Sequence, residues 1–212
     1  MVKRSFQKTR GVMNRQQKAL ILFGLEGKNK TEKQYFSNFK QIQDKYLIRW
    51  ASGNATDPVG IVENIKKDIL QKNLKAGDRA FAVFDIDIDP LKEDVVEKAR
   101  NLAKEHNIEL ITSNPCFEVW FVLHFEDSTA SYNSSKDVIN KLRTYITGYK
   151  KSDDVFKVLQ GRMKAAILRA KKLRAYHKNN KTCKLSEQNP VTGVDQVVEL
   201  LCDSGEVVTG LV

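Results

Sequence analysis

Cysteine is scarce in this chain, and the few cysteines form no recognisable pattern. Cys116, Cys183 and Cys202 are far apart and odd in number, and no two are spaced as Cys-x-x-Cys. A disulfide framework needs paired cysteines, and a cysteine-based zinc site needs closely spaced ones. We therefore exclude both classes and expect a reducing, cytoplasmic setting.

Long hydrophobic runs are also missing. No apolar run approaches the ~20 residues of a membrane-spanning helix, and the charged N-terminal region is not followed by the apolar segment of a signal peptide. We expect no membrane segment and no secretory leader. The chain also lacks Gly-x-x-x-x-Gly-Lys-Ser/Thr, a common triphosphate-binding loop, which argues against a nucleotidyl transferase or a primase-like enzyme.

Acidic residues are rare in two stretches of the chain. Residues 1–18 carry six Lys or Arg and no acid, and residues 140–184 carry fourteen against Asp153 and Asp154. The rest of the chain is acidic on balance, although the net charge is +10. An acidic centre with basic flanks fits an enzyme that holds cations centrally and nucleic acid peripherally. The alternative is a basic surface that only keeps the protein soluble.

Apolar strands and helical patterns alternate through the first half of the chain. A helix is expected from Thr31, with Gln34 completing a capping box, and another after Asp57-Pro58, an N-cap followed by proline. The expected strands are 19–25, 46–51, 79–84 and 108–112, and the third helix is 91–106. This order predicts an α/β fold with a parallel sheet covered by helices on both faces.

The chain changes character from residue 114. We expect a short apolar helix ending near residue 125, a polar loop over 126–135, and helices at 138–146, 154–178 and 194–202. The long helix has an apolar stripe and a basic opposite face, on which Arg162, Arg169 and Lys172 are candidate nucleic-acid contacts. The chain therefore divides into a flexible basic arm (1–17), an α/β core (18–125) and a basic helical extension packed on that core (126–212).

Three aspartates follow the third strand. Asp85, Asp87 and Asp89 alternate, so they share one face if the chain stays extended. Clustered carboxylates repel one another unless they are solvated, paired or bound to a cation. Oxygen-only ligands favour Mg²⁺ or Mn²⁺, and Glu26, which follows the first strand, falls on the same sheet edge. The alternative is an ordinary solvated turn, which Asp and Pro also mark.

Taken in order, the motifs of this chain resemble those of the RloB-like family. They are Glu26-Gly27, Thr31-Glu32-Lys33-Gln34-Tyr35-Phe36, Phe84-Asp85-Ile86-Asp87, Ser113-Asn114-Pro115-Cys116-Phe117-Glu118-Val119-Trp120, His124-Phe125 and Asn189-Pro190-Val191-Thr192. The resemblance extends from about Lys18 to Leu201. Each motif is weak by itself, but the ordered set is fairly specific.

The resemblance implies a Toprim-like core, as in topoisomerases, primases and OLD-type nucleases. A Glu after the first strand and an Asp-x-Asp after the third would then hold a divalent metal; these positions are Glu26, Asp85 and Asp87, with Asp89 as a further acid. Two features depart from the family pattern. The spacing from Glu26 to Glu32 is one residue longer, which puts a role for Glu32 in doubt, and Ile86 replaces an expected basic residue.

The roles we expect follow from the chemistry of phosphodiester cleavage. Glu26 would exchange protons, and Lys28 and Lys30 would neutralise developing negative charge, although a solvated loop explains these lysines equally well. Helix capping is the simpler explanation for Glu32 and Glu118. An indirect role at the metal site also stays open for Glu118, because Asn114-Pro115 follows the fourth strand at the same sheet edge. His124 is expected to be a packing residue.

The resemblance implies a metal-dependent nuclease of bacterial anti-phage defence. It would cut DNA or RNA, with tRNA as one candidate substrate, and would act beside an ATPase partner or a restriction system. The alternative is a non-catalytic nucleic-acid-binding or regulatory subunit that keeps the Toprim scaffold. A pure binder would ignore EDTA but lose affinity steeply as salt rises.

Overall fold

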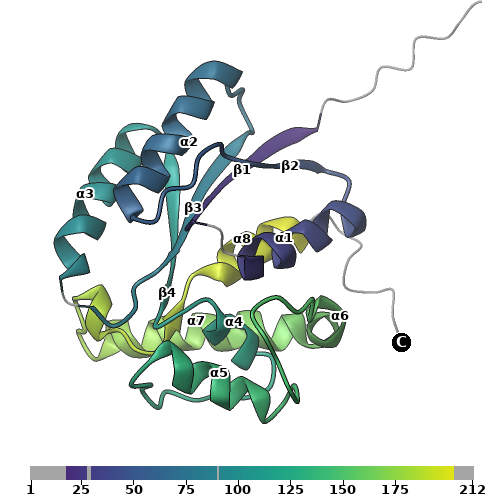
Figure 1. Cartoon of the computed structure of the whole chain (residues 1–212), viewed down its shortest axis with the longest axis vertical. Coiled ribbons are helices and arrows are strands. Elements are labelled where there is room, and N and C mark those ends of the chain that lie inside the picture. The colour runs from purple at the N-terminus through teal and green to yellow at the C-terminus, as the bar shows by residue number, and fades with distance from the viewer. Residues whose placement is uncertain (1–17, 28–29, 90, 203–212) are drawn as a thin grey trace, which may run out of the picture.

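Four parallel strands and one short antiparallel strand form the central sheet of the computed structural model (Figure 1). The structure describes residues 18–27, 30–89 and 91–202, so the predicted arm, 1–17, lies outside it. The strands are β1 (Ala19–Leu25), β2 (Tyr46–Trp50), β3 (Arg79–Asp85), β4 (Ile108–Asn114) and β5 (Val191–Thr192). Their order is β2-β1-β3-β4-β5.

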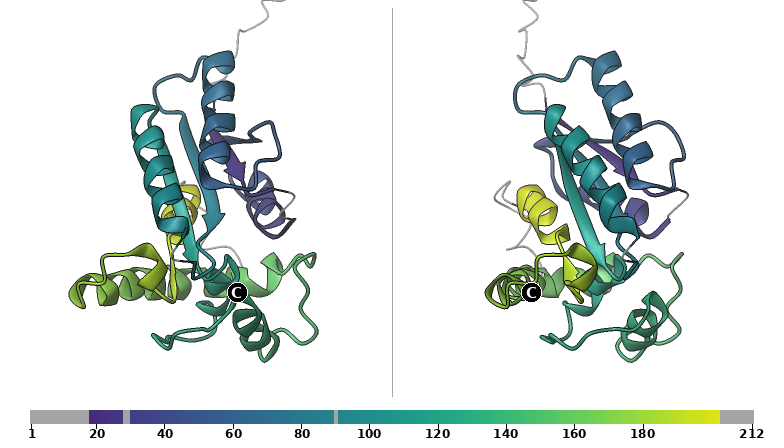
Figure 2. Two further views of the ribbon diagram at one scale, coloured as in Figure 1. Left: turned by 60° about the vertical axis from the view of Figure 1, so that its left-hand side comes forward. Right: turned by 90° about the vertical axis from the view of Figure 1, so that its left-hand side faces the viewer.

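Helices cover both faces of this sheet (Figures 1 and 2). They are α1 (Lys30–Ile42), α2 (Pro58–Lys72), α3 (Lys92–Glu105), α4 (Glu118–Val122), α5 (Ser135–Arg143), α6 (Phe156–Leu159), α7 (Met163–Asn179) and α8 (Val194–Cys202). Helices α2 and α3 pack on one face, and α1 and α8 lie on the other. The predicted α/β class is confirmed, and the arrangement is consistent with a Toprim-like fold.

Two hydrophobic cores result from the alternation of side chains along the strands. In β3, Phe81 and Val83 belong to the core under α1 and the C-terminal helices, whereas Ala82 and Phe84 belong to the core under α2 and α3. Because both faces are buried, β1 is apolar throughout rather than alternating, as parallel strands usually are. Gly24 in β1 allows this close packing, since a Cβ there would lie 2.6 Å from the Ile65 side chain on α2.

The two predicted helix starts have different outcomes. Asp57 caps α2 as predicted: its carboxylate accepts a hydrogen bond from Gly60 N at 2.9 Å, and Pro58 begins the helix. The capping box at Thr31 is wrong, because α1 already begins at Lys30. The Thr31 hydroxyl instead donates to the carbonyl of Lys151 at 2.8 Å. It therefore joins α1 to the C-terminal part of the chain.

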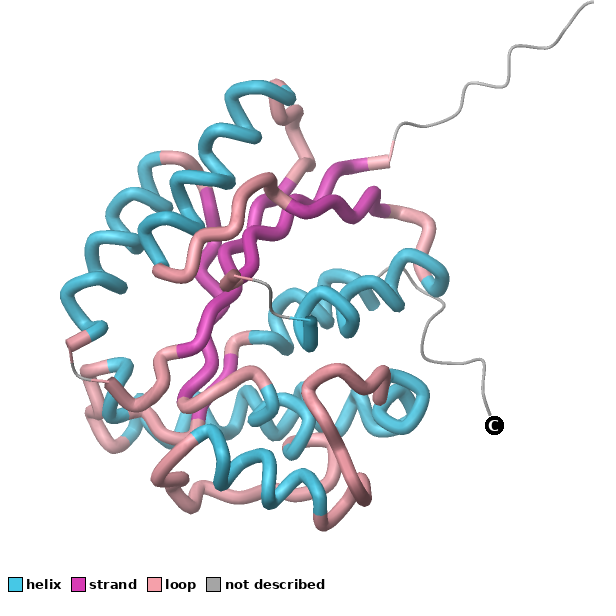
Figure 3. The backbone as a smooth tube through the Cα atoms, in the orientation of Figure 1, coloured by secondary structure: helices cyan, strands magenta, loops and turns pink. Residues whose placement is uncertain are grey.

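The C-terminal part completes the fold. The predicted helix 154–178 is divided into α6, a 3₁₀ turn over 160–162, and α7, and the two-residue strand β5 was not predicted. Residues of α5, α7 and α8 share the core of β1 and β3, so the extension covers one face of the sheet. Helices α4 to α7 lie together at the lower end of Figures 1 and 3. None of the helices described is long and apolar enough to cross a membrane.

Candidate functional site

Asp85 is the last residue of β3 and is only 8% exposed. Burial raises the pKa of its carboxyl well above the ordinary value, and the negative charges of Glu32, Glu118, Asp87 and Glu26 raise it further. Both effects favour the neutral acid over the carboxylate. Asp85 is therefore the centre of a cluster of five acidic residues, which we call the acidic cluster.

Glu26 joins the acidic cluster from the neighbouring strand. It directly follows β1, and its Oε2 accepts a hydrogen bond from the backbone N–H of Asp85 at 3.4 Å. Burial raises the pKa of Glu26, and this outweighs the opposing effects of that hydrogen bond and of Lys92. The sequence-based expectation that Glu26 and Asp85 meet at the carboxyl edge of the sheet is thus correct in its geometry.

The expectation that Asp85, Asp87 and Asp89 share one face is wrong. The strand ends at Asp85, and Asp87 and Ile88 adopt positive φ values of 59° and 58°. The turn is held by β4 and its continuation, because Ile86 N donates to Ser113 O at 2.9 Å and Asp87 N donates to Pro115 O at 3.1 Å. These tertiary hydrogen bonds override the extended geometry that alternation alone predicts.

The turn separates the roles of the two later aspartates. The Asp87 carboxylate forms an ion pair with Nζ of Lys92, the first residue of α3, at 2.5 Å. Burial lowers the pKa of Lys92, but the hydrogen bond and charge of Asp87, with Glu26 and Asp85, raise it overall. Asp89 accepts a hydrogen bond from Leu91 N at 2.9 Å, as in an ordinary turn.

Glu32 and Glu118 belong to the acidic cluster, although the sequence favours helix capping as their role. Both are almost fully buried, at 2% and 1% exposure, and their charges act on Asp85 more strongly than those of Asp87 and Glu26. The available signal was an acid within the otherwise apolar segment 116–123, because a buried carboxylate is rare without a specific reason.

The loop between α5 and α6 contacts the acidic cluster at Glu118. Tyr149 Oη donates to Glu118 Oε1 at 3.3 Å, and Lys151 Nζ lies 3.7 Å from the same oxygen. Burial lowers the pKa of Lys151, but the charge of Glu118, followed by Cys116, Asp85 and Glu32, raises it overall. Within the described part of the chain, Glu118 Oε2 is buried without a hydrogen-bond partner.

Side chains are described for three of the five predicted nucleic-acid contacts. Lys28 lies outside the described residues, and only the backbone of Lys30 is described. Arg169 donates to the Leu123 carbonyl at 2.8 Å, Lys172 pairs with Asp127 at 2.5 Å, and Arg162 lies over the Phe125 ring. These three side chains link α7 and the 3₁₀ turn before it to the segment after α4, and their role as nucleic-acid contacts stays a prediction.

The donor chemistry of the acidic cluster fits a hard divalent cation. Its members offer only carboxylate oxygens, one of them an orphaned buried atom, and a cation would relieve their mutual repulsion. In residues 18–27, 30–89 and 91–202, however, no three His, Cys, Asp or Glu side chains are grouped closely enough to hold an ion as they stand. Ion binding would therefore require side-chain movement, and Asp87 would have to leave Lys92.

Comparison with known families agrees with the ordered motifs. The sequence model of the RloB-like proteins matches residues 21–201. The chain belongs to the RloB-like family. The match begins within β1 and ends within α8, so the RloB-like region includes the acidic cluster and the C-terminal helices that complete the fold. Neither a curated protein nor a solved structure matches the chain.

Proposed function

We propose that this RloB-like protein is a Mg²⁺- or Mn²⁺-dependent nuclease whose acidic cluster is the reaction centre. The burial of Asp85 among four other carboxylates carries the proposal. A protein that needs Asp85 only for stability would neutralise it with a cationic side chain, because isolated buried charges are costly. A divalent ion offsets the repulsion and leaves coordination positions for substrate oxygens.

The residues of the cluster have distinct proposed roles. Glu26, Asp85, Asp87 and Glu118 would hold the ion; Asp89 is the weakest of the proposed ligands because it already caps a turn. The ion would polarise the scissile phosphodiester and lower the pKa of water. Glu26 accepts a proton, since burial brings its pKa nearer to neutrality. Lys92 and Lys151 are cations at the rim that can contact a phosphate oxygen.

The biological setting that we propose is anti-phage defence. Family membership supports this setting through the resemblance described above, which also suggests an ATPase partner or a restriction system. Both DNA and RNA, including tRNA, stay open as substrates. The basic balance of the chain, +10 overall, favours a nucleic-acid partner of either kind.

The second candidate is a nucleic-acid-binding or regulatory subunit without catalytic activity. The Asp87–Lys92 ion pair favours it, because an acid already paired with lysine is not waiting for a metal. In this case binding would be independent of EDTA and would weaken steeply with salt.

The test is cleavage of supercoiled plasmid and of total tRNA with Mg²⁺ or Mn²⁺. Cutting should stop with EDTA and fall by about 100-fold or more in Asp85→Ala and Asp87→Ala, while circular dichroism shows a folded protein. Asp44→Ala, in the turn between α1 and β2, is the matched surface control and should cut normally. Metal-independent cutting, or full activity in both cluster variants, would sink the nuclease proposal.

A further inference from the structure

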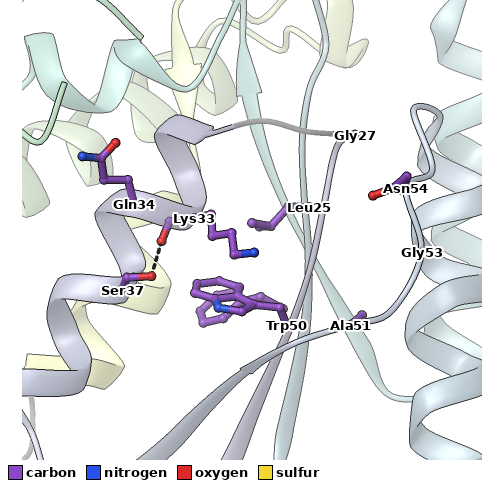
Figure 4. Close-up of a pocket in the computed structure, with 10 residues that line it drawn as sticks. Leu25, Gly27, Lys33, Gln34, Ser37, Trp50, Ala51, Gly53 and Asn54 are labelled. Carbon is purple, nitrogen blue, oxygen red and sulfur yellow. Dashed lines mark hydrogen bonds between the residues drawn. The ribbon is translucent and has the colours of Figure 1, made fainter. Parts of the chain in front are cut away.

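A cavity of about 470 Å³ lies beside the acidic cluster, and the roles assigned above do not use it. It opens at the carboxyl ends of β1 and β2, between α1 and the loop that follows β2 (Figure 4). Its volume falls in the range of small-ligand sites, about 300–1,000 Å³. The walls combine an aromatic ring, Trp50, with the basic side chain Lys33 and the polar side chains Ser37 and Asn54.

The Trp50 ring is supported on one side by the core. Trp50 is the last residue of the edge strand β2 and is partly exposed. Its ring centroid lies 5.5 Å from that of Phe23, which is fully buried and in turn stacks on Phe36 at 4.6 Å. An aromatic ring fixed in this way loses little conformational freedom when a flat ligand stacks on it.

Two lysines of α1 lie over the same ring. Lys33 Nζ is 6.0 Å and Lys40 Nζ is 5.1 Å from the Trp50 ring centroid. They are both exposed and are separated by two helical turns. Lys33 lines the cavity and Lys40 lies over the Trp50 ring, so the ring has two cations beside it. An aromatic platform beside a row of cations is the combination with which proteins bind single-stranded nucleic acid: a base stacks and its phosphates pair with the cations.

The cavity is joined to the acidic cluster through the end of β1. Gly27, a lining residue, directly follows Glu26. It has a φ of 53°, and its N–H donates to Ala55 O at 2.6 Å, so the connection is held to the loop after β2. Trp50 and Asp85 end β2 and β3, and Glu26 directly follows β1, the strand between them. The register sets Trp50 level with a position three residues before Glu26 on β1 and four residues before Asp85 on β3. At about 3.3 Å per residue this is roughly 10–13 Å along the strands, so one single strand of nucleic acid can reach both places over a few nucleotides.

We propose that this cavity binds one unpaired nucleobase a few nucleotides from the phosphodiester that the acidic cluster cleaves. Trp50 stacks on the base, and Lys33 and Lys40 contact the backbone phosphates. The inference rests on the proposed nuclease function and specifies its substrate class: a single strand, or a strand with an unpaired base a few nucleotides from the cleavage point. A base inside a continuous duplex cannot reach Trp50 unless it leaves the stack.

The binding test uses Asp85→Asn protein in EDTA, so that no cleavage occurs. Affinity for a fluorescent 10-nucleotide single strand is compared with affinity for a hairpin duplex of the same sequence, by anisotropy, with DNA and RNA versions of each. The single strand should bind more tightly. Adding Trp50→Ala should weaken its binding by about 5- to 150-fold, the range for loss of one stacked base, whereas Trp50→Phe should retain most of it.

An abasic strand separates base stacking from a general loss of structure. A strand of the same length without bases should bind equally to proteins with Trp50 and with Trp50→Ala. Lys33→Gln and Lys40→Gln should weaken the binding of both the intact and the abasic strand, and should lower the salt dependence of that binding. Equal affinity for the single strand and the hairpin would overturn the inference. So would a Trp50→Ala variant that loses as much affinity for the abasic strand as for the intact strand.

Failure of this inference and failure of the nuclease proposal have different signatures. Trp50-dependent binding by a protein that cuts nothing with Mg²⁺ or Mn²⁺ would retain the base site and reject the nuclease. Cleavage by Trp50→Ala with an unchanged KM would retain the nuclease and reject the base site.

Discussion

Asp85 and Asp195 are two buried aspartates with opposite surroundings. Asp195, in α8, is 0% exposed, and its carboxylate accepts hydrogen bonds from the two terminal nitrogens of the Arg174 guanidinium, with Nη2 2.7 Å from Oδ2. Arg174 also donates to Thr192 O at 2.7 Å. Asp85 is instead surrounded by carboxylates. The fold thus neutralises the aspartate that joins α7 to α8, and leaves the one at the sheet edge to be neutralised by a proton or a cation.

The largest effect should come from breaking the neutralised pair. Arg174→Met leaves the carboxylate of Asp195 buried and unpaired, so the free energy of unfolding should fall by about 3–5 kcal/mol. Lys171→Met is the control on the same helix. It breaks the exposed Lys171–Glu199 pair and should cost at most about 1 kcal/mol. Urea denaturation measures both, and equal losses would show that Asp195 does not depend on Arg174.

His124 shows a third way to bury a titratable group, by keeping it neutral. It is 1% exposed, its Nδ1 lies 2.9 Å from Trp120 O, and its ring packs against the Trp120 ring. This agrees with its expected packing role. Burial lowers its pKa from 6.5 to about 4. The unfolded chain therefore takes up a proton below pH 6.5, whereas the folded protein does so only near pH 4.

This difference predicts how stability depends on pH. The contribution of His124 is fully present above pH 6.5 and is lost as the pH falls from 6.5 to 4, by up to about 3 kcal/mol. His124→Asn keeps an N–H for the Trp120 carbonyl but does not titrate. The difference in urea midpoint between the variant and the unmodified protein should change over this pH range. A constant difference would mean that His124 takes up its proton equally in the folded and unfolded states.

A smaller effect of the opposite sign is expected at the acidic cluster. Asp85→Asn replaces a buried carboxyl, whose ionised form its four acidic neighbours repel, with a neutral amide of nearly the same volume, so in EDTA it should stabilise the protein by roughly 1 kcal/mol. The equivalent change Asp195→Asn removes the partner of Arg174 and should destabilise it. Differential scanning calorimetry at neutral pH measures both. Destabilisation by both variants would remove the contrast between the two aspartates.

The sequence predicts the elements whose causes are local. The apolar run of β1 and the Asp57-Pro58 start of α2 are decided by neighbouring residues, and both are found as expected. The pairing of Glu26 with Asp85 also follows from strand order. Local pattern is sufficient where periodicity, capping and the rules of parallel sheets determine the result.

Long-range contacts determine the features that the sequence does not predict. The turn at Asp87 and Ile88 depends on one carbonyl of β4 and one just after it, and a positive φ at a β-branched residue runs against local preference. Glu118 reaches Asp85 through the turn that joins β4 to α4, and β5 consists of only two residues paired with β4. Such contacts have no signature in the spacing of neighbouring residues.

The central claim is that Asp85 is left for a divalent cation, and thermal unfolding with added ions tests it most directly. The melting temperature should rise by a few degrees when Mg²⁺ or Mn²⁺ reaches about ten times its dissociation constant. Asp68→Asn, which alters a buried aspartate already paired with Lys72, should keep this rise, and Asp85→Asn should lose it. An equal rise in both variants, or no rise in the unmodified protein, would contradict the account.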